Sequence, residues 1–257
     1  MAGPGADAAD EAEVVQFFHA LADRTRLAIV RSLAESDLRA GEIVALVALP
    51  QNAVSYHLRQ LRGIGLLRDR RSSADGRDVY YSIDQERLQA LYQRAGAVLR
   101  PLGPPRHRAT GPARIGEPLR LLFLCTHNSA RSQLAEGIAR QIGRAGVVVA
   151  SAGDTPTALH PLTAELLAEW AIDPALHTSK PLEAFSGHTF DYVITVCDRV
   201  REQCPTFPGS PRQLHWSIPD PIAAPVAERR AAFLAVRHEI AVRVRHLLRE
   251  RAVLHVA

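Results

Sequence analysis

The sequence predicts two domains, a mainly α-helical winged helix-turn-helix followed by an α/β domain. The chain has 257 residues and a mass of 28.1 kDa, which is long for one compact domain and sufficient for two cores. Residues 101–118 hold five prolines and three glycines and read as an extended linker. We therefore place the domains at residues 1–100 and 119–257.

The N-terminal half carries the pattern of a helix-turn-helix followed by a hairpin. Apolar residues at helical spacing begin it, and Asp23 is a suitable cap for a second helix. Two short helices follow, separated by a break at Pro50. Residues 66–71 and 79–83 flank a polar turn and predict a hairpin, before a last helix over residues 85–99. This order is typical of a winged helix.

Several segments of this half resemble the ArsR-type family of metalloid-responsive repressors. The segments that carry the likeness, within residues 13–100, are residues 18–27, 54–61, 65–67 and 77–81. The resemblance implies a homodimer held by the first and last helices, with residues 51–61 entering the major groove of operator DNA. The candidates for DNA contact are Gln51, Asn52, Ser55, Tyr56 and Arg59 on that helix, and Arg70, Arg71 and Arg77 on the wing.

The chain departs from that family in the residues that bind the inducing metalloid or metal. Many members sense arsenite through a cysteine pair where this chain has residues 38–42, which contain no cysteine. Others bind metal through the last helix, but residues 85–100 contain no histidine, aspartate or cysteine. Elsewhere no His-x-x-x-His or Cys-x-x-Cys pair predicts a zinc site. We expect no bound metal, so the repressor either answers another signal or receives it from the other half.

Charge and composition set the expected environment. The net charge is +4, and residues 51–80 hold six arginines against three aspartates, an excess that suits phosphates but also an ordinary solvated surface. No signal peptide begins the chain, and no apolar run approaches the roughly 20 residues of a membrane helix. We expect a soluble, cytoplasmic protein without a membrane partner. Three cysteines in that reducing compartment favour catalytic or redox chemistry.

Cys125 opens a loop between an apolar strand over residues 119–125 and a helix over residues 132–141. The spacing Cys, five residues, Arg predicts a loop whose backbone N–H groups surround a tetrahedral oxyanion such as arsenate or phosphate. Between them lie Thr126, His127, Asn128, Ser129 and Ala130. The helix N-terminus and Arg131 favour the nucleophilic thiolate of Cys125, and Ser132 is placed to hydrogen-bond it. Asn128 suits a left-handed backbone in a tight loop.

With further segments, this loop resembles the thioredoxin-coupled arsenate reductases, which share the fold of the low-molecular-weight tyrosine phosphatases. The match spans residues 119–250, and the segments that carry it are residues 122–137, 151–153, 191–198, 204–205 and 215–221. The resemblance implies a four-stranded parallel sheet flanked by helices, the last over residues 226–251. It also implies that no cofactor is bound and that thioredoxin acts as an external reductant.

The mechanism implied by the resemblance uses all three cysteines. Cys125 attacks arsenate while Asp220 protonates the departing oxygen as general acid. Cys197 then attacks the sulfur of Cys125, which releases arsenite and leaves a disulfide. Cys204 resolves that disulfide by thiol exchange, and thioredoxin reduces the resulting Cys197–Cys204 pair.

A phosphatase that uses the same loop on a phosphoester is the chief alternative. Phosphotyrosine-directed relatives usually follow the acidic Asp-Pro with an aromatic residue, whereas Ile222 stands here, and they lack the Cys197 and Cys204 pair. Both features favour a reductase. For the whole chain, the alternative is a phosphatase-like domain that serves the repressor as an oxyanion or redox sensor.

Lys180 is the only lysine in a chain rich in arginine. Potassium-assisted relatives have an aspartate at this place, beside residues that match Asn128, Glu136 and Ser151. We therefore expect the Lys180 ammonium to replace the cation and turnover to be independent of potassium, the alternative being a solvated lysine.

Overall fold

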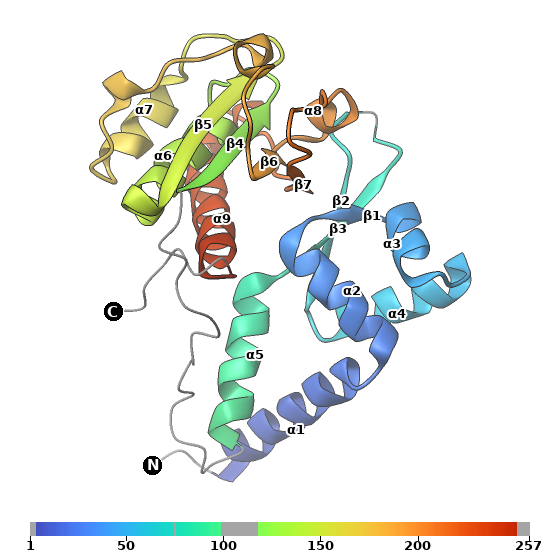
Figure 1. Cartoon of the computed structure of the whole chain (residues 1–257). Coiled ribbons are helices and arrows are strands. Elements are labelled where there is room, and N and C mark those ends of the chain that lie inside the picture. The colour runs from blue at the N-terminus through green and yellow to red at the C-terminus, as the bar shows by residue number, and fades with distance from the viewer. Residues whose placement is uncertain (1–3, 75, 99–117, 251–257) are drawn as a thin grey trace. The chain divides into compact units, whose positions relative to one another are not determined.

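The computed structural model describes residues 4–74, 76–98 and 118–250 (Figure 1). It divides into two compact units, one formed by the elements up to residue 98 and the other by the elements from residue 119 onward. The predicted linker lies outside the described residues apart from Pro118. None of the helices in the described ranges is long and apolar enough to cross a membrane.

The N-terminal unit has the predicted order of helices and hairpin. Its elements are α1 (Pro4–Leu21), α2 (Arg24–Glu35), β1 (Leu38–Arg39), α3 (Ala40–Val47), α4 (Gln51–Gly63), β2 (Leu67–Arg71), β3 (Val79–Ile83) and α5 (Gln85–Val98). The Asp23 side chain accepts a hydrogen bond from the Arg26 backbone N–H at 2.9 Å and so caps α2 as expected. Ala48, with φ 52°, ends α3, and Pro50 precedes α4.

The sheet of this unit has one more strand than predicted. β1 pairs with β3, and the antiparallel order is β1-β3-β2. Two residues are too few to show the alternation by which a strand is recognised in a sequence. The core beneath the sheet is apolar and includes Ile29, Leu33, Ile43 and Leu61, each at most 1% exposed.

The C-terminal unit is an α/β domain. Its main elements are β4 (Leu119–Cys125), α6 (Arg131–Gly143), β5 (Val147–Gly153), α7 (Pro161–Ala168), β6 (Tyr192–Thr195), α8 (Asp198–Glu202), β7 (Arg212–His215) and α9 (Arg229–Glu250). Four 3₁₀ turns join them at Arg144–Gly146, Pro174–Leu176, Leu182–Phe185 and Pro221–Ala223.

The sheet of this unit is four-stranded and parallel, which confirms the predicted fold class. Its order is β5-β4-β6-β7, and helices α6 and α9 pack against each other beside it (Figure 1). Leu121, Leu122, Phe123 and Leu124 on β4 are all 0% exposed, as expected for a parallel strand covered on both faces. β4 therefore delivers the residues that follow it to the carboxyl end of the sheet, where parallel α/β folds bind ligands.

Candidate active site

The residues from Cys125 to Ser132 form a closed loop at the carboxyl end of β4. The Cys125 sulfur accepts a hydrogen bond from the Asn128 backbone N–H at 3.2 Å and lies 2.9 Å from the Ser132 hydroxyl. Asn128 has φ 46°, the left-handed conformation expected for it. α6 begins at Arg131, so its N-terminal N–H groups face the same space as the sulfur. The loop thus combines a thiol with the donors that an oxyanion requires.

Arg131 joins this loop to the segment that carries Asp220. One terminal nitrogen donates to the Ile218 carbonyl at 3.1 Å and the other to Asp220 Oδ2 at 3.0 Å. The other carboxylate oxygen of Asp220 accepts a hydrogen bond from the Ile222 N–H at 3.1 Å. Asp220 is only partly buried, whereas the Arg131 side chain is 7% exposed. The structure thus brings the predicted general acid beside the predicted anion-binding arginine.

The Asn128 side chain is the centre of a buried network. Its Nδ2 donates to Ser132 Oγ and to Ser151 Oγ, both at 2.8 Å. Its Oδ1 accepts from the Lys180 backbone N–H at 2.7 Å. Ser151 in turn donates to Glu136 Oε2 at 2.5 Å. Every hydrogen-bonding atom of this amide therefore holds a neighbour of the loop in place.

Glu136 carries a buried carboxylate with two cationic partners. Lys180 Nζ lies 3.3 Å from one oxygen, and Arg140 donates to the other at 2.5 Å. Lys180 Nζ also donates to the Thr178 carbonyl at 2.8 Å. The structure thus places the Lys180 ammonium next to Glu136 and Ser151, the neighbourhood expected for it, and adds Arg140, which the sequence pattern did not indicate.

The two remaining cysteines differ in position. Cys197, two residues beyond the end of β6 and 2% exposed, has its sulfur 3.5 Å from the hydroxyl of Thr126 in the loop. Burial, and then the nearby Cys125, raises the pKa of Cys197. Cys204 is half-buried, its recorded contact is with the Pro205 carbonyl at 3.7 Å, and burial raises its pKa. All three cysteines are free thiols; Cys197 contacts the loop through Thr126, and Cys204 packs against the hydrophobic core.

The segment after β7 is anchored by buried polar and aromatic contacts. His215 Nδ1 lies 2.8 Å from the Thr195 hydroxyl, and Nε2 lies 3.1 Å from Asp198 Oδ1. The Trp216 ring packs on Phe123 of β4, with ring centroids 5.7 Å apart. These contacts fix the chain that leads to Asp220.

Two buried residues of the site carried no role in the sequence prediction. Gln133, 0% exposed, donates from Nε2 to Asn128 Oδ1 at 3.1 Å and to the Thr178 carbonyl at 2.9 Å. Its Oε1 lies 2.9 Å from His177 Nδ1. The feature that could have indicated Gln133 is its place in the first turn of α6, where it is a polar residue among buried ones. Across the described ranges, no group of three or more His, Cys, Asp or Glu side chains is placed to hold a metal ion.

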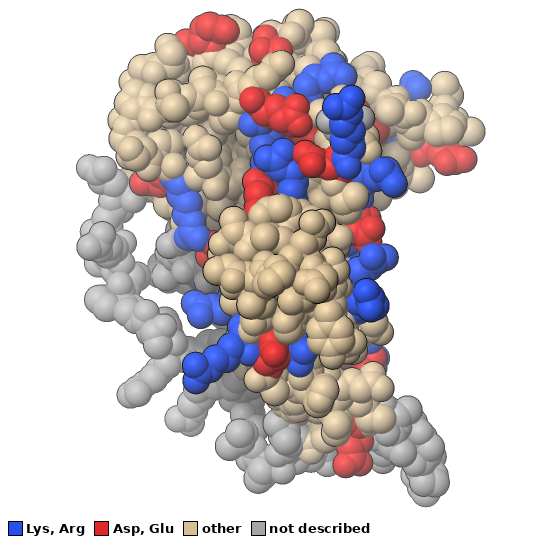
Figure 2. Space-filling view, turned by 90° about the vertical axis from the view of Figure 1, so that its right-hand side faces the viewer, with Lys and Arg blue, Asp and Glu red and all other residues tan. Residues whose placement is uncertain are grey.

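The candidate DNA-contacting residues lie on the surface of the N-terminal unit. Tyr56 is 50% exposed, and Gln51, Asn52, Ser55 and Arg59 are exposed on the same helix, α4. On the wing, Arg71 and Arg77 are exposed and Arg70 is half-buried. Neighbouring arginines are paired with acids, as Arg62 is with Asp69 at 3.0 Å. Basic and acidic side chains are accordingly interspersed on the face in Figure 2.

The family comparisons separate the two halves of the chain. Residues 120–254 match the model of the low molecular weight phosphotyrosine protein phosphatases. Residues 23–69 match the model of the bacterial regulatory proteins of the arsR family. The first match covers the Cys125 loop, Cys197, Cys204 and Asp220, and the second covers α4.

Several characterised proteins are similar to the C-terminal half. Arsenate reductase 2 of Staphylococcus epidermidis is 36% identical over 120 residues, 47% of this chain and 88% of the relative. An arsenate reductase of Staphylococcus aureus is 35% identical over 124 residues, 48% of this chain and 92% of the relative. A solved arsenate reductase in its oxidized state is 29% identical, with a TM-score of 0.46 over 51% of this chain and 98% of that one. The chain thus belongs to the low molecular weight phosphotyrosine protein phosphatase family, with an ArsR-family segment ahead of that domain.

Proposed function

We propose that the C-terminal unit reduces arsenate to arsenite and that the N-terminal unit regulates arsenic resistance as a DNA-binding repressor. The observation that carries the proposal is the placement of a second thiol, Cys197, against the oxyanion loop of Cys125. The similarity to named arsenate reductases over this domain supports the same substrate. A phosphoester hydrolase has no use for that second thiol.

The first step makes a bond between sulfur and arsenic. The Cys125 thiolate attacks the arsenic of an arsenate held by the loop and by Arg131, and an As–O bond breaks as Asp220 protonates the departing oxygen, which leaves as water. Ser132, 2.9 Å from the sulfur, stabilises the thiolate. Arsenic remains in the +5 state at this stage.

The second step transfers the electrons. The Cys197 thiolate attacks the Cys125 sulfur, an S–S bond forms, and the electron pair of the S–As bond leaves with arsenic as arsenite. The two sulfurs lose two electrons and arsenic gains them. Because burial and the charge of Cys125 raise the pKa of Cys197, its thiolate forms most readily once the Cys125 sulfur is bound to arsenic.

The third step restores the nucleophile. The Cys204 thiolate attacks the Cys197 sulfur, so that the disulfide passes to Cys197–Cys204 and the Cys125 thiolate leaves. Cys204 contacts its own neighbour Pro205 in the structure, so the segment that follows α8 must move toward Cys197 for this exchange. A thioredoxin dithiol then reduces the pair, which places the activity in the cytoplasm.

For the regulatory half, we propose that residues 1–100 form a dimeric DNA-binding domain, joined by the linker 101–118 to the reductase at 119–257. The exposed face of α4 reads the operator, and the wing arginines contact phosphates. The exposure of Tyr56 and its neighbours on α4 supports that role.

The test is arsenate-dependent oxidation of NADPH in the presence of thioredoxin and thioredoxin reductase. We expect steady turnover by the native chain and its loss in Cys204→Ser. Hydrolysis of p-nitrophenyl phosphate is assayed in parallel, because the loop of the phosphatase alternative would cleave it. Phosphatase activity without arsenate turnover would replace the reductase proposal with that alternative.

A further inference from the structure

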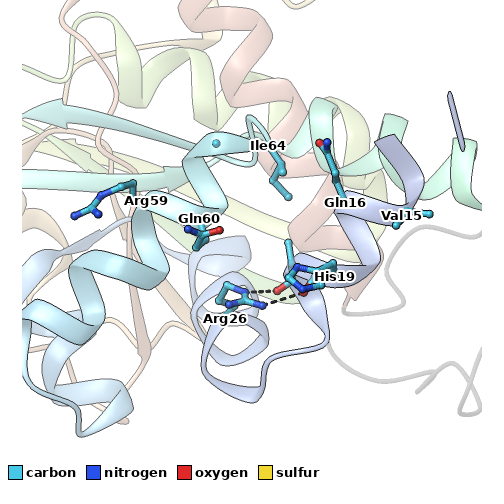
Figure 3. Close-up of a pocket in the computed structure, with 9 residues that line it drawn as sticks. Val15, Gln16, His19, Arg26, Arg59, Gln60 and Ile64 are labelled. Carbon is cyan, nitrogen blue, oxygen red and sulfur yellow. Dashed lines mark hydrogen bonds between the residues drawn. The ribbon is translucent and has the colours of Figure 1, made fainter. Parts of the chain in front are cut away.

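A pocket of about 380 Å³ lies within the N-terminal unit, between α1, α2 and α4. Figure 3 shows Ile64, Gln60, His19 and Arg26 turned toward one another across it, while the guanidinium of Arg59 is directed outward. No acidic side chain is among the described residues that line it. The pocket has no part in the chemistry proposed above.

Arg26 gives this pocket a positive floor. The side chain is 8% exposed, and it donates from Nε to the Ala20 carbonyl at 2.5 Å and from one terminal nitrogen to the His19 carbonyl at 2.9 Å. These bonds cap the end of α1 but leave three of the five guanidinium N–H groups without a partner in the described part of the chain. The guanidinium forms no ion pair there within 4.0 Å, although the hydrogen bond from the Arg26 backbone N–H, and then the charge of the guanidinium, lower the pKa of the nearby Asp23, which caps α2. A buried charge of this kind is stabilised by an anion.

The remaining lining defines the rest of the ligand. Gln60 and His19 add hydrogen-bonding groups beside Arg26, and Val15, Ala20 and Ile64 supply apolar surface. We propose that this pocket binds a small organic anion, a carboxylate or sulfonate with an apolar body. Because α4 is one wall, such a ligand lies against the helix proposed to read DNA and supplies a signal that needs no sensor cysteines.

The probe is 1-naphthoate, with the neutral 1-naphthamide as its isostere, followed by ¹⁵N NMR of the full chain. We expect 1-naphthoate to shift the amides of Gly63 and Ile64 saturably and 1-naphthamide to bind at least about ten-fold more weakly. Equal binding of both probes, or no saturable shift, would overturn the proposal.

A variant that fills the pocket and retains Arg26 keeps this test independent of any effect of Arg26 on folding. Gly63 lines the pocket and a Cβ there has no atom within 4 Å, so we expect Gly63→Phe to fill the pocket and to leave Arg26 in place. Gly41, on α3, is equally open, and Gly41→Phe is the matched control. Loss of 1-naphthoate binding in Gly63→Phe alone supports the pocket, whereas unchanged binding in that variant contradicts it.

A second observation concerns the direction of the hydrogen bonds that end at Cys125. Gln133 Nε2 donates to the Thr178 carbonyl, so its Oε1 faces His177, and His177 Nδ1 must carry the proton between them. Asn128 Oδ1 accepts from the Lys180 N–H, so its Nδ2 donates to Ser132. Ser132 Oγ therefore accepts from Asn128 and keeps its own proton for the Cys125 sulfur.

The result is an unbroken chain of donors from His177 through Gln133, Asn128 and Ser132 to Cys125. His177 is 4% exposed, and its Nε2 has no hydrogen-bond partner among the described residues, which is consistent with a neutral ring protonated on Nδ1. We infer that His177 is a positioning residue that fixes the Gln133 amide and thereby orients the Ser132 proton toward the thiolate. This inference rests on Cys125 as the nucleophile but not on arsenate turnover.

The test measures alkylation of Cys125 by iodoacetamide in a Cys197→Ser, Cys204→Ser background. We expect His177→Leu to slow alkylation about three- to ten-fold at pH 7 and His177→Asn, which restores a donor at the place of Nδ1, to recover most of the rate. The difference should vanish at strongly alkaline pH, where the thiol ionises without help. Gln133→Leu should behave as His177→Leu does, which provides a second route if one variant fails to fold. Equal rates in the native background and both leucine variants would contradict the inference.

Discussion

The oxyanion loop buries most of its polar side chains, whereas the proposed DNA-reading helix exposes its own to solvent. Asn128, Ser132 and Gln133 are each 0% exposed, and other protein groups satisfy their hydrogen bonds. On α4, Tyr56 is 50% exposed and Arg59 points to solvent. The loop is therefore organised before its ligand arrives, whereas α4 presents Tyr56 and Arg59 to solvent. Changes in the loop should have large, mutually dependent effects, and changes on α4 should have small, additive ones.

The largest expected effect lies at the three thiols. Cys125→Ser should abolish arsenite production, since no S–As bond can form. Cys204→Ser should still release about one arsenite per chain, because the Cys125–Cys197 disulfide can form once but cannot be resolved. Arsenite release measures both, in a rapid-quench assay without thioredoxin for the first arsenite and in a steady-state assay with thioredoxin and thioredoxin reductase for further turnover. Full multiple turnover by Cys204→Ser would remove Cys204 from the relay.

A stability comparison tests the contrast directly. Asn128→Ala should lower the free energy of unfolding of the C-terminal unit by about 2–4 kcal/mol, because it strains a left-handed backbone position and leaves buried partners unsatisfied. Asn52→Ala, on the exposed face of α4, should change stability by less than about 0.5 kcal/mol. Urea unfolding followed by Trp170 and Trp216 fluorescence reports the first, and circular dichroism the second. Similar losses in both would invalidate the contrast.

The contribution of the wing arginines to DNA affinity should depend on the salt concentration and hardly at all on the DNA sequence. Arg71→Gln and Arg77→Gln should each reduce the slope of log affinity against log salt concentration by about 1 on non-operator duplex DNA. Fluorescence anisotropy of a labelled duplex gives the slope. An unchanged slope in both variants would exclude these arginines from phosphate contact.

A smaller effect should appear in the pH dependence of stability. Burial lowers the pKa of His177 in the folded chain from the ordinary value of 6.5. The unfolded chain then binds the proton more readily, so the contribution to stability is present above about pH 6.5 and is lost as the pH falls through the folded-state pKa. His177→Asn should flatten this decline between pH 7 and 5. His188→Asn, at an exposed histidine, is the control that should leave the slope unchanged.

The smallest expected effect is that of potassium on turnover, which should be absent. Because the Lys180 ammonium lies 3.3 Å from Glu136, exchange of sodium for potassium at constant ionic strength should leave native turnover unchanged. Lys180→Ala should introduce a dependence on potassium. Faster turnover of the native chain in potassium would return Lys180 to the alternative of a solvated side chain.

How far the sequence predicts the molecule depends on how local each feature is. The Asp23 cap, the turn at Pro50 and the strand, loop and helix around Cys125 are set by neighbouring residues, and each was predicted. β1 and the pairing of Gln133 with His177 were missed. The contact of Arg140 with Glu136 was also missed, although an acid and an arginine four residues apart on one helix are a local pattern. The pairing of Gln133 with His177 joins residues 44 positions apart through buried side chains, and without a motif no periodicity in the sequence reports such a contact. Domain boundaries at residues 100 and 119 remain a prediction.

The register of two neighbouring strands determines how far apart the first two thiols can be. Leu124 on β4 lies opposite Thr195 on β6, so Cys197 comes level with Thr126, one residue beyond Cys125, at the carboxyl end of the two strands. Parallel neighbours are spaced by roughly 4.8 Å, and a slip of one residue would turn the following side chain to the opposite face. In the proposed relay, the path of the electrons from arsenic into the protein therefore depends on this backbone pairing. An insertion within β6 should disconnect it even with every cysteine retained.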